Sequence, residues 1–250
     1  MNSYTKVIAQ VKSLTVWWES SIQSTAFFAA FISVVIVLLS WPDKMLYKFV
    51  LNGEIPKTFS IVSISIVLLI SLVSLVFGRA EARKTLDGLS QLPETSESPR
   101  EHELWLFAIL FFRFVMHTIL LSVLFFPMLL PGVAISRLSW VDLAKTIAII
   151  YSTAFSFRVF GFSVYLFLNK RDILDTFITS LFFLSFFLFT AIWLHFINPL
   201  VLMYHLNLSR EVIAPVPMSA FSCYHLVLLA LTLLLGLICF LKIHFKLRSK

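Results

Sequence analysis

Two arginines and a histidine lie inside long apolar stretches of the sequence, where ionisable residues are rare. Arg113 and His117 are four residues apart and so share one face of a helix, and Arg158 lies in another stretch. A charge at the centre of a bilayer costs at least about 2.5–3.5 kcal/mol on insertion scales. These residues are candidates for a cationic site in a substrate path, suited to an anionic headgroup or phosphate. The alternative is structural, with the arginines bonded to carbonyls, to aromatic faces, or to hydroxyls such as Ser152 or Ser156.

Acidic residues are almost absent from the apolar stretches. Asp175 is the one carboxylate within them, and it lies at an end. Carriers coupled to protons or sodium usually keep Asp or Glu inside the membrane as a relay or a ligand. The sequence therefore argues against such a carrier and against catalysis by carboxylates within the membrane.

The other histidines and the cysteines give weaker signals. Three histidines could lie on the outer side, but their spacing matches no metal motif, and we favour interfacial hydrogen bonding for them: His195, His205 and His225. Cys223 and Cys239 would lie about 24 Å apart along one helix, too far apart for a disulfide. We expect no metal site and no disulfide.

Membrane-spanning helices must position these residues. A helix rises about 1.5 Å per residue, so roughly 20 apolar residues cross the hydrocarbon core. Six stretches have about that length: 24–41, 58–77, 104–126, 146–168, 174–197 and 223–241. Charged residues make up 13% of the 250-residue chain, whereas a typical soluble domain has about 25%. We expect an all-α polytopic membrane protein, with six transmembrane helices in a single domain over residues 1–250.

The first residues predict a helix on the membrane surface. Val7, Val11, Leu14 and Trp18 recur at helical spacing, with polar residues around the rest of the helix. Trp17 joins Trp18 just before the first span, where indoles favour the interface. We expect an interfacial amphipathic helix over 3–22; a frayed extension of the first span is the alternative.

Lysine and arginine in the connecting segments predict the orientation. If both termini are cytoplasmic, twelve of these cations lie inside: Lys6, Lys12, Arg79, Arg83, Lys84, Arg100, Lys170, Arg171, Lys242, Lys246, Arg248 and Lys250. Six lie outside: Lys44, Lys48, Lys57, Arg137, Lys145 and Arg210. This bias favours cytoplasmic termini. The cations flank spans, so the net charge of +7 needs no nucleic-acid partner, and the basic carboxyl-terminal tail suits anionic membrane lipids.

Two of the connections are unusual. Segment 79–103 is charged and carries Leu86, Leu89 and Leu92 along one edge of a short helix that Pro93 ends. Such an edge suits the docking of a soluble partner, although a solvated connector has the same composition. Segment 198–222 is too apolar for a free loop and too short to span, and prolines break it. It predicts a re-entrant segment before the last helix, with a plain apolar surface loop as the alternative.

The layout resembles the permease subunit of ABC transporters of the ABC-2, or type V exporter, class. Members commonly have an interfacial amino-terminal helix, six spans and re-entrant helices between the last two spans. Their cytoplasmic loop after the second span has the form E-x-x-x-T-L-x-x-L-x-x-x-P. Here Glu81, Thr85, Leu86, Leu89 and Pro93 fit that form.

The resemblance implies a function and a set of partners. It implies two permease copies, identical or paralogous, in a bacterial-type inner membrane, with P-loop ATPase subunits that bind the ATP and magnesium. Glu81, Thr85, Leu86, Leu89, Leu92 and Pro93 would then couple the permease to the ATPase. This chain has no G-x-x-x-x-G-K-[ST] run, so we expect neither nucleotide hydrolysis nor a cofactor of its own. The third span departs from the family, because His102 and Glu103 lie where a lysine often opens it.

Two other functions fit the same six spans. One is a substrate-capture module of an importer, which predicts one copy around a bound small molecule. The other is a membrane scaffold without a transport path. An exporter predicts instead two permease copies with a groove between them, and the sequence does not identify the substrate.

Overall fold

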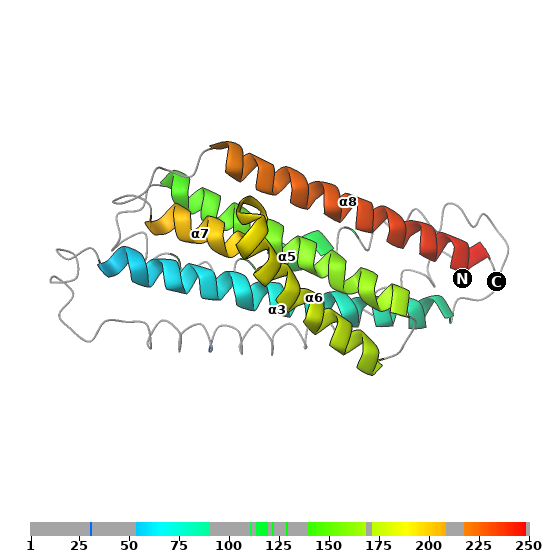
Figure 1. Cartoon of the computed structure of the whole chain (residues 1–250). Helices are drawn as coiled ribbons and strands as arrows, with labels where there is room; N and C mark the ends of the chain where they lie inside the picture. Colours follow the sequence, from blue (N-terminus) through cyan, green and yellow to red (C-terminus); the bar gives the residue numbers. More distant parts are fainter. Residues whose placement is uncertain are drawn as a thin grey trace.

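A computed structural model describes residues 31, 54–90, 111, 114–119, 122, 129, 140–168, 172–208 and 218–248. The regular structure of these ranges is helical (Figure 1). The elements are α3 (Glu54–Ser90), α5 (Trp140–Leu168), α6 (Asp172–Trp193), the 3-10 helix η1 (His195–Ile197), α7 (Pro199–Leu208) and α8 (Met218–Arg248). The predicted interfacial helix over 3–22, nearly all of the first span and most of the third lie outside the described residues.

Within the described ranges, three helices are long and apolar enough to cross a bilayer. Their candidate spans are Val62–Arg83 in α3, Trp140–Leu168 in α5 and Phe221–Phe245 in α8. They coincide with the predicted second, fourth and sixth spans. α6 has a shorter apolar part, Phe177–Trp193, inside the predicted fifth span. The chain is thus an all-helical membrane protein by the length and composition of these helices.

α3 and α5 run parallel to each other through the middle of the structure. Val62, early in α3, belongs to the same buried cluster as Leu143, early in α5. Leu86, late in α3, belongs to the same cluster as Leu166, late in α5. Figure 1 shows the two helices lying side by side in the same direction.

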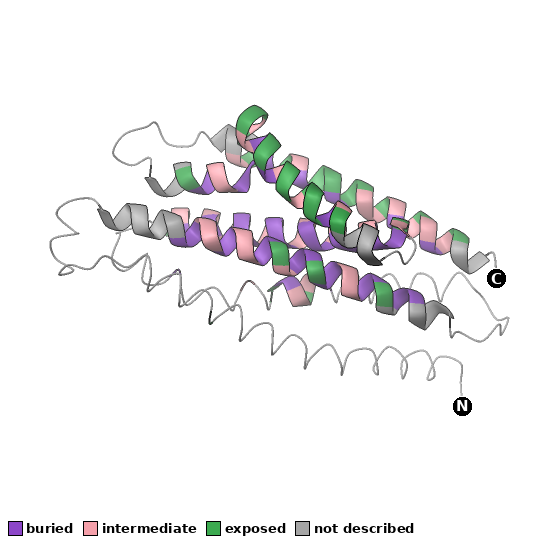
Figure 2. Cartoon of the chain, turned by 60° about the horizontal axis from the view of Figure 1, so that its bottom comes forward, coloured by how far each residue is buried: buried purple, intermediate pink, exposed green. Residues whose placement is uncertain are grey.

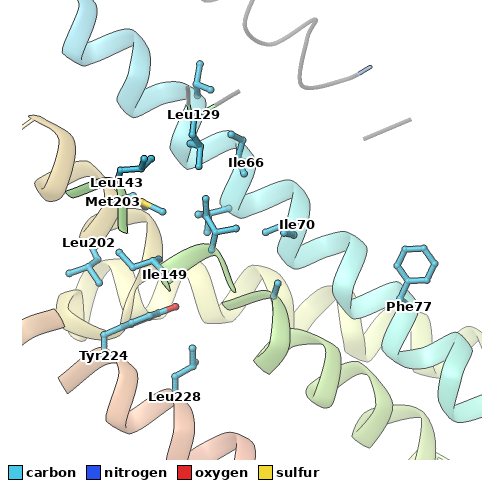
Figure 3. Packing of buried hydrophobic residues seen from close by; sticks show 14 residues of the cluster. Ile66, Ile70, Phe77, Leu129, Leu143, Ile149, Leu202, Met203, Tyr224 and Leu228 are labelled. Carbon is cyan, nitrogen blue, oxygen red and sulfur yellow. The ribbon is translucent and has the colours of Figure 1, made fainter. Parts of the chain in front are cut away.

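α8 lies along α5 in the same direction. Tyr224, early in α8, hydrogen-bonds to Thr153, and Cys239, late in α8, hydrogen-bonds to Ser163. Figure 3 shows Tyr224 reaching from α8 toward the buried apolar side chains of the other helices. The cluster around it joins residues of α3, α5, α7 and α8, and it forms the core at the amino ends of the three long helices.

α6 runs antiparallel to α5 and packs on it through aromatic rings. Phe182 stacks on Phe160 with ring centroids 3.8 Å apart, and Phe187 stacks on Phe157 at 5.6 Å. In these pairs the residue numbers rise along α6 while they fall along α5. α6 therefore carries the chain back toward the amino ends of α3 and α5.

A buried asparagine joins α6 to α7. Asn198 is fully buried, and its Nδ2 donates to the carbonyl oxygen of Phe187 at 2.9 Å and to Thr190 Oγ1 at 3.0 Å. Its Oδ1 accepts from the backbone N–H groups of Leu200 at 2.8 Å and Val201 at 3.2 Å. Asn198 therefore caps α7 and ties the start of that helix to α6.

α7 lies inside the helix packing. Leu202 and Met203 are buried in the cluster with α3, α5 and α8, and Figure 1 shows α7 continuing toward the amino ends of α3 and α5. Within the predicted segment 198–222, residues 199–208 thus form a short helix rather than a surface loop, and its Leu202 and Met203 are buried. Residues 209–217 lie outside the described part.

α6 and α8 each present an apolar face. α3 and α5 are buried along much of their length, whereas α6 and α8 expose large apolar side chains (Figure 2). Leu184 and Ile192 of α6 are exposed, as are Leu226 and Leu233 of α8. Lipid tails are as apolar as leucine, so such faces are stable within a bilayer.

α3 corrects one expectation about the connections. The sequence predicts that the second span ends at residue 77 and that a loop with its own short helix follows. The structure instead continues α3 through Gly78 to Ser90 without a break. Gly78 marks a close contact with α5 rather than a helix end, so residues 79–90 belong to the same rigid element as the span. Residues 91–103 lie outside the described part.

Candidate functional site

The candidate site begins at a close crossing of α3 and α5. A Cβ atom at Gly78 would lie 2.9 Å from the backbone nitrogen of Phe162 and closer still to the carbonyl oxygen of Arg158. A Cβ atom at Gly161 would lie 3.0 Å from the carbonyl carbon of Leu75 and closer still to its oxygen. Two glycines thus allow the backbones to touch, as small residues do between membrane helices.

An ion pair joins the same two helices beside this crossing. Arg158 Nη2 donates to Glu81 Oε2 at 2.9 Å, and Arg158 Nε donates to the same oxygen at 3.2 Å. The side chains of Arg158 and Glu81 are 0% and 1% exposed. An isolated charge at such a position would carry a desolvation cost of several kcal/mol. Each residue therefore makes burial of the other possible.

A third helical stretch, residues 114–119, contributes two more groups. His117 Nδ1 lies 3.3 Å from Arg158 Nη2, and the Phe114 ring centroid lies 5.1 Å from Arg158 Cζ. A guanidinium can only donate, so His117 Nδ1 is the acceptor and its ring carries the proton on Nε2. Arg158 thus contacts a carboxylate, an imidazole and an aromatic face, from two neighbouring helical segments.

The structure places two of the three predicted path residues together. His117 and Arg158 lie within hydrogen-bonding distance, while Arg113 lies outside the described residues. Of the structural partners expected for Arg158, the aromatic face is present. The hydroxyls bond elsewhere, since Ser152 donates to the Ile149 carbonyl and Ser156 pairs with another hydroxyl in α8.

Glu81 is the site residue that sequence reasoning misplaced. The end of the apolar run at residue 77 put Glu81 in a cytoplasmic loop, and we expected Asp175 to be the one carboxylate within a span. The structure places Glu81 in the candidate span Val62–Arg83, buried against α5. We expected no proton- or sodium-coupled carrier because the spans contained almost no carboxylates. The buried Glu81 removes the basis of that expectation.

Some of the predicted coupling residues are buried within the chain, and the side chains of the others lie outside the described part. Thr85 is buried and its hydroxyl donates to the Glu81 carbonyl at 2.8 Å, while Leu86 is 4% exposed in a cluster that includes Phe162 and Tyr165. Leu86 therefore packs within the chain and is not part of an exposed docking edge. The described features do not include the side chain of Leu89 or residues Leu92 and Pro93.

A ladder of polar pairs fixes α8 to α5. The pairs are Thr153 with Tyr224, Ser156 with Thr232, and Ser163 with Cys239. In each pair one hydroxyl also donates to the carbonyl four residues earlier in its own helix, so it accepts from its partner. The ladder satisfies these polar groups in an apolar setting and sets the register of the two helices.

The predicted outer histidines lie apart from this site. His195 is exposed in η1, and His225 Nδ1 contacts the Phe221 carbonyl within α8 at 2.8 Å; the side chain of His205 is outside the description. Among the side chains that the structure describes, no group of three or more His, Cys, Asp or Glu residues could hold a metal ion.

Comparison of the chain with models of known protein families, with curated proteins and with solved structures finds no match.

Proposed function

We propose that this chain is the membrane-spanning permease subunit of an ATP-driven ABC exporter. In this proposal a separate P-loop ATPase binds ATP and magnesium, and a second permease copy, identical or paralogous, completes the transport path. The carrying observation is that α3 extends unbroken from its apolar span to Ser90 and is locked to α5 by the Gly78 contact and the Glu81–Arg158 ion pair.

The direction of the helices supports a six-span layout. α3, α5 and α8 run in the same direction. The chain therefore has to cross back to the starting side between α3 and α5, and again between α5 and α8. α6 followed by α7 makes one return. Segment 91–139 has to make the other, and it contains the apolar stretch 104–126. With 24–41 as the first span, both termini would lie on one side, and the distribution of lysine and arginine favours the cytoplasmic side.

The rigidity of α3 supports mechanical coupling. A helix transmits displacement along its axis, and the buried contacts of Glu81 and Leu86 join the charged end of α3 to α5. A push at that end would move both helices as one body and change access to a path beside them. Glu81, Thr85 and Leu86 then transmit movement from within the bundle. The ATPase would then dock on the exposed Arg83 and on Leu89, Leu92 and Pro93.

A proton-coupled carrier is the second candidate, because the structure buries Glu81 beside Arg158 and His117. Carboxylates and histidines inside membrane proteins serve as proton relays. In that case the same cluster would exchange a proton during transport, and no ATPase would be required.

Purification of the full chain from its native membrane in a mild detergent separates these functions. The exporter proposal predicts that a protein with a P-loop copurifies in an equal number of copies and hydrolyses ATP. Leu89→Asp should remove that protein without lowering the melting temperature of the permease. Trp140→Asp is the matched control, because it places the same charge on an exposed residue at the opposite end of the bundle.

The remaining outcomes distinguish the alternatives. A chain that purifies without an ATPase but moves protons in liposomes under an imposed pH gradient is a carrier. The flux should then stop in Glu81→Gln at a temperature at which melting shows that this variant is still folded. A single copy that retains a bound small molecule indicates a substrate-capture module. A chain with neither partner nor flux is a scaffold.

A further inference from the structure

The parallel helices bring basic residues to one end of the bundle. The carboxyl ends of α3, α5 and α8 lie together, because their late residues share one buried cluster. Figure 1 shows the last turns of α5 and α8 at the same end. Arg79, Arg83 and Lys84 lie in the last turns of α3, and the last turns of α8 contain Lys242, Lys246 and Arg248. In α8, Lys246 and Arg248 lie in the last turn, where cations complement the helix dipole.

The length of α5 places this end at the headgroups of a bilayer. α5 begins at Trp140, which is 73% exposed, and exposed indoles favour the membrane interface. Its 29 residues extend about 44 Å at the rise of a helix, which matches the thickness of a bilayer with its headgroups, about 40–45 Å. Phe167, near the end of α5, therefore lies at the opposite headgroup layer.

Lys242 of α8 lies at the level of the same headgroup layer. Its Nζ lies 4.3 Å from the ring centroid of Phe167, and the side chain is half-buried. Phe167 and Phe245 are 46% and 66% exposed. A fixed ammonium group therefore lies on one exposed ring, and Phe245 follows it by three residues on the same side of α8. Neighbouring side chains can thus contact a phosphate and acyl chains.

We infer that the carboxyl end of the bundle binds the headgroup of an anionic phospholipid, with Lys242 contacting the phosphate and Phe167 and Phe245 contacting the upper acyl chains. The lysines and arginines at this end select an anionic over a zwitterionic headgroup. The site uses residues of α5 and α8 that the proposed transport function does not require, so it stands independently of that function.

The test measures binding of two lipids to the purified full chain in neutral detergent by native mass spectrometry and by melting temperature. Phosphatidylglycerol should be retained and should raise the melting temperature, whereas phosphatidylcholine with the same acyl chains should do neither. Lys242→Gln should weaken phosphatidylglycerol binding about fivefold, as expected for one lysine near the surface. Lys242→Arg should restore it.

Lys145→Gln is the control, because this half-buried lysine lies near the amino end of α5, and it should leave binding unchanged. Equal loss in both glutamine variants, or no loss in Lys242→Gln, would overturn the inference. Glycerol phosphate supplies the headgroup without acyl chains. If it protects the protein as well as the lipid does, the site takes a free phosphate and the lipid assignment is wrong. Equal melting temperatures of the variants without lipid establish that each one is folded.

Discussion

Glu81 and Arg158 neutralise each other between α3 and α5, with 2.9 Å separating the carboxylate oxygen from the guanidinium nitrogen. They come from helices whose backbones already touch at Gly78, so neither side chain has to reach far. His117 and Phe114 add contacts from a third helical stretch. The pair explains how an arginine near the middle of an apolar helix is accommodated, and it links two helices that would have to move together in a transport cycle.

Breaking this pair from one side should destabilise the protein strongly. Arg158→Gln and Glu81→Gln should each lower the free energy of unfolding by about 3–5 kcal/mol, because each leaves a buried charge without its main counter-charge. The double variant should lose less than the sum of the two. A double-mutant cycle on melting or denaturant unfolding in detergent measures this coupling.

The Arg158→Gln variant also tests whether Arg158 has the predicted role in a substrate path. Because its guanidinium holds Glu81, we expect the melting temperature of Arg158→Gln to fall together with transport activity. Loss of substrate-stimulated activity at an unchanged melting temperature would instead assign Arg158 to substrate. A stable and fully active Arg158→Gln protein would contradict both roles.

Alanine at either crossing glycine should separate α3 from α5. Gly78→Ala and Gly161→Ala each place a methyl group against backbone atoms, and overpacking of this kind costs about 1–3 kcal/mol. Gly236 is the matched control in α8, because a Cβ atom there would meet nothing within 4 Å. Gly236→Ala should therefore be neutral or slightly stabilising, since alanine favours a helix over glycine. The measurement is the melting temperature of the three variants, and equal effects would contradict the close crossing.

The sequence predicts the long helices well and their contacts poorly. Apolar length alone locates the spans in α3, α5 and α8, because about 20 apolar residues in a row suit a bilayer. It does not show where a helix ends when charged residues follow, so the sequence assigned Glu81 to a loop. A glycine such as Gly78 indicates either a helix end or a close contact, and only the position of α5 decides between them.

The sequence also does not predict the contacts within the charged cluster. Arg158 and His117 stand out in the sequence because ionisable residues are costly in a membrane. The carboxylate that pairs with Arg158 belongs to Glu81, 77 residues away, and no local pattern connects the two residues. A signal was available in the rule that a buried arginine needs a carboxylate, since few carboxylates lie near any span. Asn198 was missed for a related reason, because its two bonds to α6 arise only when α6 folds back toward α7.

Asn198 should be needed for the connection between α6 and α7. Asn198→Ala removes the cap and both bonds to α6, at a cost of about 1–3 kcal/mol. Asn198→Asp keeps an oxygen for the cap but turns a carboxylate oxygen toward the Phe187 carbonyl, so we expect it to be the more destabilising change despite the usual preference for Asp at such positions. Ser180→Ala on the exposed face of α6 is the control for the melting measurement. A stable Asp variant would show that the Nδ2 bonds contribute little.

Cysteine labelling should place the two ends of the bundle on opposite sides of the membrane. The amino ends of the parallel helices should be outside, so cysteines at Lys48, Trp140 and Ser209 should react with an impermeant maleimide in intact cells. Cysteines at Ser96 and Phe245 should react only after the cells are opened. The background is a variant with Cys223 and Cys239 replaced by alanine, because both thiols are free. Labelling of Ser96 from outside would reverse the orientation, and it would exclude the charged end of α3 as the docking site of a cytoplasmic ATPase.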